Sequence, residues 1–383
     1  MNVVFFPRND YPNNIEVCNH RLGKKVTYCE CTTDIPDFVQ NTILPYFVTA
    51  HNTKSLKVGT YFGWQYLNSA WNTAYGKQCI SDGVIWPDLY FYPGSDYSEE
   101  HILSVYNNYA LPFFLEQFGK KPIVIDFSQG VQSYKQYLAD KFLGADSSNQ
   151  ELLKTDYGVG VGSPNDVPYT LSRYYPRNMN SRVLDNARAD IIANSAYNTP
   201  QEKDYYDYYI NQMSDLIDDT LALQNGGFIM NFHHWHDLVK MDYNTDGTPI
   251  AGRNDYAINN GFKPYIDMLC QKNVNNEIYF AGYGEAVAYL LFRQYIQKAV
   301  MYSPNAHPND QIIIRLEVPN SLNVDTELLS VPISVKFSTN GTPLANSSIR
   351  CKNHNLVSIG NNQYIVEIPY NEYAGVLIEK VIS

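Results

Sequence analysis

Strand-like and helix-like segments alternate along the first three hundred residues of this 383-residue chain. Short apolar runs at 25–29, 56–62 and 121–126 are typical of buried strands, whereas the segment 101–118 carries apolar residues at three- and four-residue spacing. Alternation of this kind is typical of a mostly parallel sheet covered by helices. Over such a length it predicts a β/α barrel.

A different pattern begins after a proline-containing segment at 304–308. Beyond it, apolar and polar residues alternate with a period of two in the runs 312–318, 331–337 and 364–369, and Asn-Gly and Gly-Asn turns join these runs. This periodicity predicts a small antiparallel β-sandwich. We therefore expect three parts: an N-terminal segment (1–23), a β/α barrel (24–303) and an accessory β-sandwich (304–383).

The chain is acidic, and its charge limits the partners that it can have. It carries 28 Lys and Arg against 39 Asp and Glu, a formal net charge of −11. Because phosphate binding needs clustered basic residues, this balance argues against a nucleic-acid partner. No apolar run approaches the roughly 20 residues that span a bilayer, and residues 1–8 lack the basic start and apolar stretch of a signal peptide. We expect synthesis in the cytoplasm, with export, if any, by a non-classical route such as release in a virion or by cell lysis.

Tyrosine is unusually frequent, with 33 Tyr beside 17 Phe and 4 Trp. A phenol ring offers an apolar face and a hydroxyl group, which suits sugar rings and hydrated interfaces. Biased residue usage would produce the same count. The tyrosine content therefore favours a glycan partner only together with a site.

The densest cluster of chemically versatile side chains follows the strand-like run 227–232 and comprises His233, His234, Trp235 and His236. Active sites of β/α barrels lie where strands end, and imidazoles act as acids, bases and metal ligands near neutral pH. In an extended segment His234 and His236 share a face, whereas His233 faces the other way. The alternative for each of them is a structural histidine or a surface loop.

Acidic residues follow other strand-like runs. Asp34 and Asp37 come after the run 25–29, where paired carboxylates can hold a metal or act as a general base. Asp37 would serve equally well as the cap of the following helix. Asp126 and Glu285 also lie at strand ends and could form the carboxylate pair of a glycosidase. For Glu285 the alternative is an acid at a helix N-terminus that interacts with the helix dipole.

The order of these elements over residues 24–300 resembles the polysaccharide deacetylase superfamily, the NodB-type β/α barrels that remove acetyl groups from glycans. Thr33-Asp34-Ile35-Pro36-Asp37 stands where the family has Thr-Phe-Asp-Asp, and Phe232-His233-His234 stands at the late Leu-x-His motif. The C-terminal sandwich is similar to accessory modules that follow some of these barrels.

This resemblance implies a set of roles for residues of the chain. Asp34 would be the general base, and His233 or His234 the general acid. A divalent, zinc-like metal would lie near Asp37, with His236 as a further candidate ligand.

The chain departs from the family at the second motif, His-x-x-x-His. The corresponding stretch, 83–94, has no histidine and contains instead Trp86, Asp88, Tyr90 and Tyr92. Metal binding would then rest on Asp37 and Asp88, which are a poor set of ligands for zinc. The aromatic residues of this stretch, together with Trp235, predict a surface on which sugar rings stack.

Three hypotheses about function follow, in this order. The first is a divergent deacetylase that removes acetyl groups from a surface polysaccharide. The second is a non-catalytic glycan-binding or structural component of a virion tail or appendage, which keeps the barrel without the metal site. The third is a glycosidase that uses Asp126 and Glu285. All three imply a polysaccharide or oligosaccharide partner, and a homo-oligomer or a larger assembly stays open.

Overall fold

The structure is a computed structural model, and it describes residues 9–33, 35, 37–63, 73–91, 94–127, 137–138, 141, 144–147, 161–162, 171–172, 200–224, 226–233, 238, 258, 262–319 and 326–381. The chain forms two compact units. The larger unit is Lys25–Val287, and the smaller unit combines Met1–Lys24 with Ala288–Ser383.

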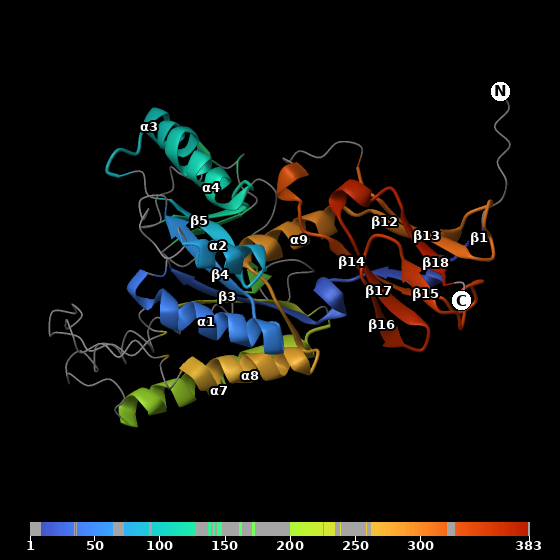
Figure 1. Ribbon diagram of the computed structural model, residues 1–383, viewed down its shortest axis with the longest axis horizontal. Coiled ribbons are helices and arrows are strands. Elements are labelled where there is room, and N and C mark those ends of the chain that lie inside the picture. The colour runs from blue at the N-terminus through green and yellow to red at the C-terminus, as the bar shows by residue number, and fades with distance from the viewer. Residues whose placement is uncertain are drawn as a thin grey trace. The chain divides into compact units, whose positions relative to one another are not determined.

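A seven-stranded sheet runs through the larger unit in the order β10-β3-β4-β5-β6-β7, and β11 also pairs with β3 (Figure 1). The strands are β3 (Val26–Thr33), β4 (Val58–Gly63), β5 (Ile85–Phe91), β6 (Val124–Phe127), β7 (Gly144–Ser147), β10 (Gly227–His233) and β11 (Ile278–Phe280). All pairings in this sheet are parallel, which confirms the predicted parallel sheet. A closed barrel is not shown, because β7 and β10 end the path among the described strands. A separate pair of short parallel strands, β8 (Val161–Gly162) and β9 (Leu171–Ser172), lies outside it.

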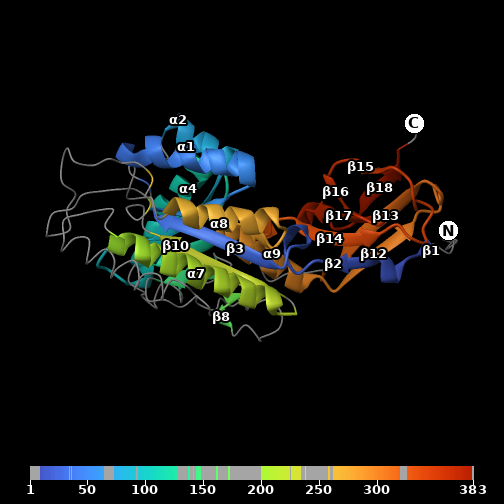
Figure 2. The same ribbon diagram turned by 90° about the horizontal axis from the view of Figure 1, so that it is seen from below.

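The helices of the described residues are α1 (Asp37–Lys54), α2 (Ala74–Ser81), α3 (Glu99–Val105), α4 (Leu111–Phe118), α7 (Pro200–Ala222), α8 (Phe262–Val274) and α9 (Tyr283–Tyr295). Five of them form a continuous row in the larger unit. Neighbours in the row are α7 and α8, α8 and α1, α1 and α2, and α2 and α4 (Figures 1 and 2). The helix predicted at 101–118 is present as α3, a π-helical turn (Tyr106–Ala110) and α4. Its first turn is capped by Ser98, and it ends at Gly119, whose φ of 66° suits a residue without a Cβ.

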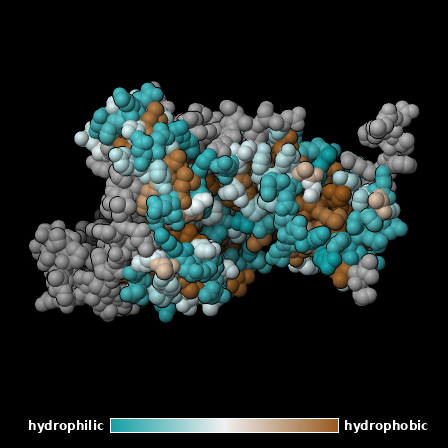
Figure 3. Space-filling model, turned by 45° about the horizontal axis from the view of Figure 1, so that its top comes forward, coloured by the Kyte–Doolittle hydropathy of each residue, from teal (hydrophilic) through white to brown (hydrophobic). Residues whose placement is uncertain are grey.

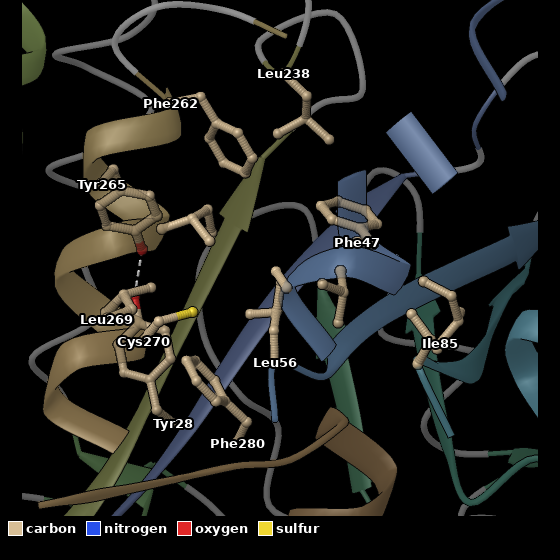
Figure 4. Packing of buried hydrophobic residues seen from close by; sticks show 14 of the residues in the cluster. Tyr28, Phe47, Leu56, Ile85, Leu238, Phe262, Tyr265, Leu269, Cys270 and Phe280 are labelled. Carbon is tan, nitrogen blue, oxygen red and sulfur yellow. Dashed lines mark hydrogen bonds between the residues drawn. The ribbon is translucent and has the colours of Figure 1, made fainter. Parts of the chain in front are cut away.

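The main hydrophobic core lies between the helix row and one face of the sheet. Tyr28 of β3 and Tyr265 of α8 meet there through their hydroxyl groups (Figure 4). Phe47 of α1 and Leu269 of α8 are at most 1% exposed, and Phe280 of β11 packs edge-on against Tyr28 at 6.2 Å. Each of these large side chains contributes about 1.5–3 kcal/mol on burial, so this face of the sheet is held by packing.

The smaller unit consists of two antiparallel sheets, as the period of two predicts. One sheet has the order β1-β12-β13-β18-β15 and the other β16-β17-β14-β2. The strands are β1 (Asn9–Asp10), β2 (Ile15–Val17), β12 (Lys298–Ser303), β13 (Gln311–Glu317), β14 (Ile333–Ser338), β15 (Ile349–Cys351), β16 (Leu356–Gly360), β17 (Gln363–Ile368) and β18 (Val376–Lys380).

The N-terminal segment is part of this smaller unit. The expected division placed 1–23 apart and residues 298–303 in the barrel, yet β1 pairs with β12, and β2 pairs with β14. Arg21 donates two hydrogen bonds to the Glu367 carboxylate, at 2.7 and 2.9 Å. Strands of two and three residues are too short to show a period, so the sequence pattern could not reveal these pairings.

The described surface seen in Figure 3 is mostly hydrophilic, with apolar patches between polar side chains. Within the described part of the chain, none of the helices combines the length and the apolar character that crossing a bilayer requires.

Candidate functional site

Two of the motifs singled out in the sequence meet at neighbouring strand ends. β10 and β3 pair in parallel. His233, the last residue of β10, lies opposite Thr32, and β3 ends one residue later at Thr33. Asp34 is the next residue in the sequence. Carboxyl ends of parallel strands meet at one edge of a sheet, and active sites of α/β proteins lie at that edge. The pairing therefore brings together two motifs that lie about two hundred residues apart in the chain.

A buried polar network fixes the register of these two strands just below their ends. Glu30 of β3 is 2% exposed and accepts a hydrogen bond from Asn231 of β10 at 3.1 Å. Tyr265 of α8 donates to the same carboxylate at 2.7 Å. Because a slip of one residue would leave these buried groups without partners, the network specifies which residues end beside each other.

The predicted site residues fall into three groups according to what the structure describes of them. Asp34, Tyr92, His234, Trp235 and His236 lie outside the described residues. For Asp37, Asp126 and His233 the structure describes the backbone, which lies at the start of α1, in β6 and at the end of β10. Trp86, Tyr90, Asp88 and Glu285 are described with their side chains.

Three of these described side chains, those of Trp86, Asp88 and Glu285, belong to a second arrangement, which the sequence did not predict as one. We call it the interior cluster and define it by Lys57, Trp86, Asp88, Lys120 and Glu285. Lys57 precedes β4, Trp86 and Asp88 lie two residues apart on β5, Lys120 precedes β6, and Glu285 lies in the first turn of α9. The two lysines therefore enter from the amino ends of their strands.

The turn between β11 and α9 reaches into this cluster. β11 pairs with the first half of β3, and β4 pairs with the second half of the same edge. The chain leaves the sheet there, where Ala281 donates to the Tyr28 carbonyl at 2.9 Å. A Cβ at Gly282 would collide with the Trp86 ring, and one at Gly284 would lie 2.5 Å from Asp88 Oδ1. Glycine is therefore required at both positions by the close approach.

Glu285 is fully engaged within the turn. It is 1% exposed and accepts hydrogen bonds from Lys57 Nζ at 2.7 Å, from the Tyr279 hydroxyl at 2.9 Å and from the Gly282 N–H at 3.2 Å. This is the arrangement expected of an acid that caps its own helix. The contacts favour that alternative over the role of a catalytic carboxylate in a glycosidase.

Asp88 is buried without a lysine in ion-pair contact among the described residues. It is 1% exposed, and its two oxygens accept from the Gly284 N–H at 3.2 and 3.4 Å. Burial raises the pKa of the Asp88 carboxyl to about 8, although the Gly284 N–H, Lys120 and the Trp86 indole oppose the shift. The group therefore holds a proton at neutral pH.

Lys120 lies over the Trp86 indole, with its Nζ 3.5 Å from the ring centre, and Lys57 Nζ is 5.8 Å from the same centre. Burial lowers the pKa of the Lys120 amine to about 8; Asp88 and Glu285 act against the shift, and Lys57 adds to it. The ring predicted to stack on sugar thus already contacts an ammonium group and the Gly282 backbone. Tyr90, two residues further along β5, is half-buried and nearer the carboxyl end of the strand.

A metal site is not formed by the described residues. In the ranges given above, no group of three or more His, Cys, Asp or Glu could hold an ion. Asp88, which the sequence offered as a ligand, and Glu285 accept hydrogen bonds from N–H and ammonium donors. They do not fit a zinc ion.

One signal in the sequence could have indicated the interior cluster. Asp88 stands as a lone acid in the apolar run of β5, whose residues 85, 87, 89 and 91 are buried. A buried acid needs donors or a proton, so a partner elsewhere in the chain was to be expected. The sequence could not show that this partner is the Gly284 N–H, because Gly284 lies 196 positions from Asp88.

No family model and no curated protein matches the chain. Among solved structures, endo-glycoceramidase II from Rhodococcus sp., in complex with a five-membered iminocyclitol, aligns with a TM-score of 0.30 and 10% sequence identity. The alignment covers 97% of this chain and 100% of that one.

Proposed function

We propose that the protein is a glycan-directed hydrolase that removes acetyl groups from a polysaccharide, with Asp34 and His233 as its acid–base pair. The observation that carries the proposal is the parallel pairing of β10 with β3, in which His233 lies opposite Thr32. The backbone of His233 thereby lies beside the end of β3, and Asp34 follows β3 in the sequence. The resemblance to polysaccharide deacetylases supports the same two roles.

The chemistry needs one base and one acid around the acetyl carbonyl. Asp34 takes a proton from the attacking water, whose oxygen bonds to the carbonyl carbon. The imidazolium of His233 then protonates the leaving nitrogen or oxygen of the sugar as the bond to the acetyl carbon breaks. Acetate and the free amine or hydroxyl are the products. His234 is the alternative acid, and Tyr90 with Tyr92 and Trp235 would supply stacking contacts to the sugar.

Acetate release from acetylated oligosaccharides tests this proposal. The protein is incubated with N-acetylated and O-acetylated oligomers, with and without added Zn²⁺, Mn²⁺ or Ca²⁺, and acetate is quantified. Asp34→Asn and His233→Ala are each expected to reduce release about 10²–10⁴-fold, the range typical of general acid–base catalysis. Asp96→Asn, which changes an exposed carboxylate of the same unit, is the matched control and should leave release unchanged. Absence of acetate with every substrate and ion would refute the proposal.

A second candidate is a glycan-binding protein without turnover. It is favoured by the aromatic residues that stand in place of the family's histidine pair, of which Tyr90 is half-buried rather than enclosed. In that case Tyr90→Ala weakens binding of an oligosaccharide in calorimetry, whereas Asp34→Asn and His234→Ala leave it unchanged. Binding with no acetate release selects this candidate over the first.

A further inference from the structure

Two buried threonine hydroxyl groups of the larger unit have no hydrogen-bond partner among the described residues. They are Thr32 Oγ1 on β3 and Thr60 Oγ1 on β4, and each residue is 1% exposed. Thr220 of α7 is also 1% exposed, but its hydroxyl donates to the Leu216 carbonyl at 2.7 Å. Because a buried polar group without a partner costs stability, the two hydroxyl groups of β3 and β4 call for a ligand.

These two threonines are direct neighbours in the sheet. β3 and β4 pair in parallel with Thr32 opposite Thr60, and aligned residues of neighbouring strands point to the same face. That face carries the main hydrophobic core, because Val58 and Phe62, two residues before and after Thr60 on β4, belong to it. The two side chains therefore stand side by side on the core face of the sheet.

The backbone around them is already used by the sheet. β3 is paired on both sides at Thr32, with Thr60 on one side and His233 of β10 on the other. β4 is also paired on both sides at Thr60, since Pro87 of β5 lies opposite it. The ladders thus occupy the backbone groups of both threonines, and a partner for the hydroxyl groups has to come from elsewhere.

The distance between the two strands matches the span of one water molecule. Neighbouring strands lie about 4.7–4.9 Å apart. A water that makes two tetrahedral hydrogen bonds of about 2.75 Å joins oxygen atoms about 4.5 Å apart. A threonine hydroxyl can both donate and accept, so a single shared water satisfies both groups. Buried waters in proteins bind between polar groups that have no other partner.

We propose that Thr32 and Thr60 form a binding site for one buried water molecule, which joins β3 to β4 at their carboxyl ends. The water accepts from one hydroxyl group and donates to the other. Thr32 lies opposite His233, the last residue of β10, and β3 ends one residue later. The water therefore links the strands through side chains at the level where the backbone ladder is about to end. This site does not depend on the proposed deacetylase activity.

A double-mutant cycle in urea unfolding, followed by tryptophan fluorescence, tests the proposal. Valine keeps the shape of threonine without the hydroxyl group. Thr32→Val and Thr60→Val each take one partner from the water and should raise the unfolding equilibrium constant about 5- to 100-fold. The double variant removes both polar groups together, so it should unfold no more readily than either single variant.

Thr220→Val is the matched control, because it removes a buried hydroxyl group that has a partner within the protein. Thr220 lies beside Gly227, at the amino end of β10, which is about 20 Å along the strand from the level of Thr32. Its effect and that of Thr32→Val should therefore add. If Thr32→Val and Thr60→Val stabilise the larger unit, or if their effects add, the two hydroxyl groups share no water and the proposal is wrong.

Nuclear Overhauser transfer detects the water in the wild-type protein, whatever the stability of the variants. With labelled threonine methyl groups, the water resonance should give cross-peaks to the methyl groups of both Thr32 and Thr60 and none to that of Thr220. The Thr220 methyl group lies equally close to its own hydroxyl proton, so it controls for transfer relayed through that proton. Absence of the cross-peak at both Thr32 and Thr60 overturns the proposal and leaves the acetate-release test unaffected.

Discussion

Replacement of Asp88 by asparagine should change how the stability of the larger unit depends on pH. The amide has nearly the shape of the protonated carboxyl group and can still accept from the Gly284 N–H, but it carries no ionisable proton. Burial raises the pKa of Asp88 to about 8 in the folded protein, against a value of 3.8 for the unperturbed group. Between these two pH values the folded state holds a proton that the unfolded state has released.

The sign and size of the effect follow from that difference. Stability falls as pH rises wherever the folded state binds more protons, at about 1.4 kcal/mol per pH unit for one proton. Wild type should therefore lose on the order of 5 kcal/mol through Asp88 between pH 4 and pH 8, and Asp88→Asn should not. The stability of the variant relative to wild type should rise across this window and level off on both sides.

Urea unfolding followed by tryptophan fluorescence measures this difference. All four tryptophans lie between residues 64 and 235, so the signal reports the larger unit. Asp215→Asn removes an exposed carboxyl group on α7 and serves as the matched control. For this variant and wild type, the free energies of unfolding should change with pH in parallel. If the free energies of unfolding of wild type and Asp88→Asn differ by the same amount at all pH values, Asp88 is not protonated in the folded protein and the reasoning is refuted.

Two further changes test the packing of each unit. Gly282→Ala places a methyl group against the Trp86 ring and should destabilise the larger unit by about 1–3 kcal/mol in the same urea assay. Gly119→Ala is the control, because a Cβ there meets open space. Its positive φ should cost no more than about 1 kcal/mol. Arg21→Ala removes the paired hydrogen bonds to Glu367 and should cost the smaller unit about 1.5–3 kcal/mol, seen as faster amide hydrogen exchange in β2 and β17 with no change in β5. Unchanged exchange in β2 would show that the N-terminal segment does not depend on this contact.

Local patterns in the sequence predicted the elements well. The period of two at 312–318, 331–337 and 364–369 corresponds to β13, β14 and β17, within two residues at each end. The apolar runs at 25–29 and 56–62 correspond to β3 and β4 in a parallel sheet. Each of these signals resides in a few consecutive residues, which is why it could be read without knowing the partner strand.

Features that depend on distant partners could not be predicted. Glu285 has an adequate local explanation as a helix-terminal acid, and nothing near it in the sequence points to Lys57, 228 residues away. The split edge of β3, which pairs with both β11 and β4, is likewise visible only in three dimensions. The stacking role predicted for Trp86 was based on its residue type alone, and the sequence could not show that Lys120 lies over the ring.

The interior cluster can be understood from the needs of one backbone turn. Where the chain leaves β11 it brings the N–H groups of Gly282 and Gly284 into the interior, and buried donors require acceptors. Glu285 and Asp88 supply them, but each carboxyl group must then be neutralised in a medium that disfavours charge. Glu285 is neutralised by Lys57 and Asp88 by a proton, so Lys120 is left with the face of an indole as its partner. The unusual state of that lysine is thus a consequence of satisfying the turn, and it would disappear if the turn were built outside the sheet.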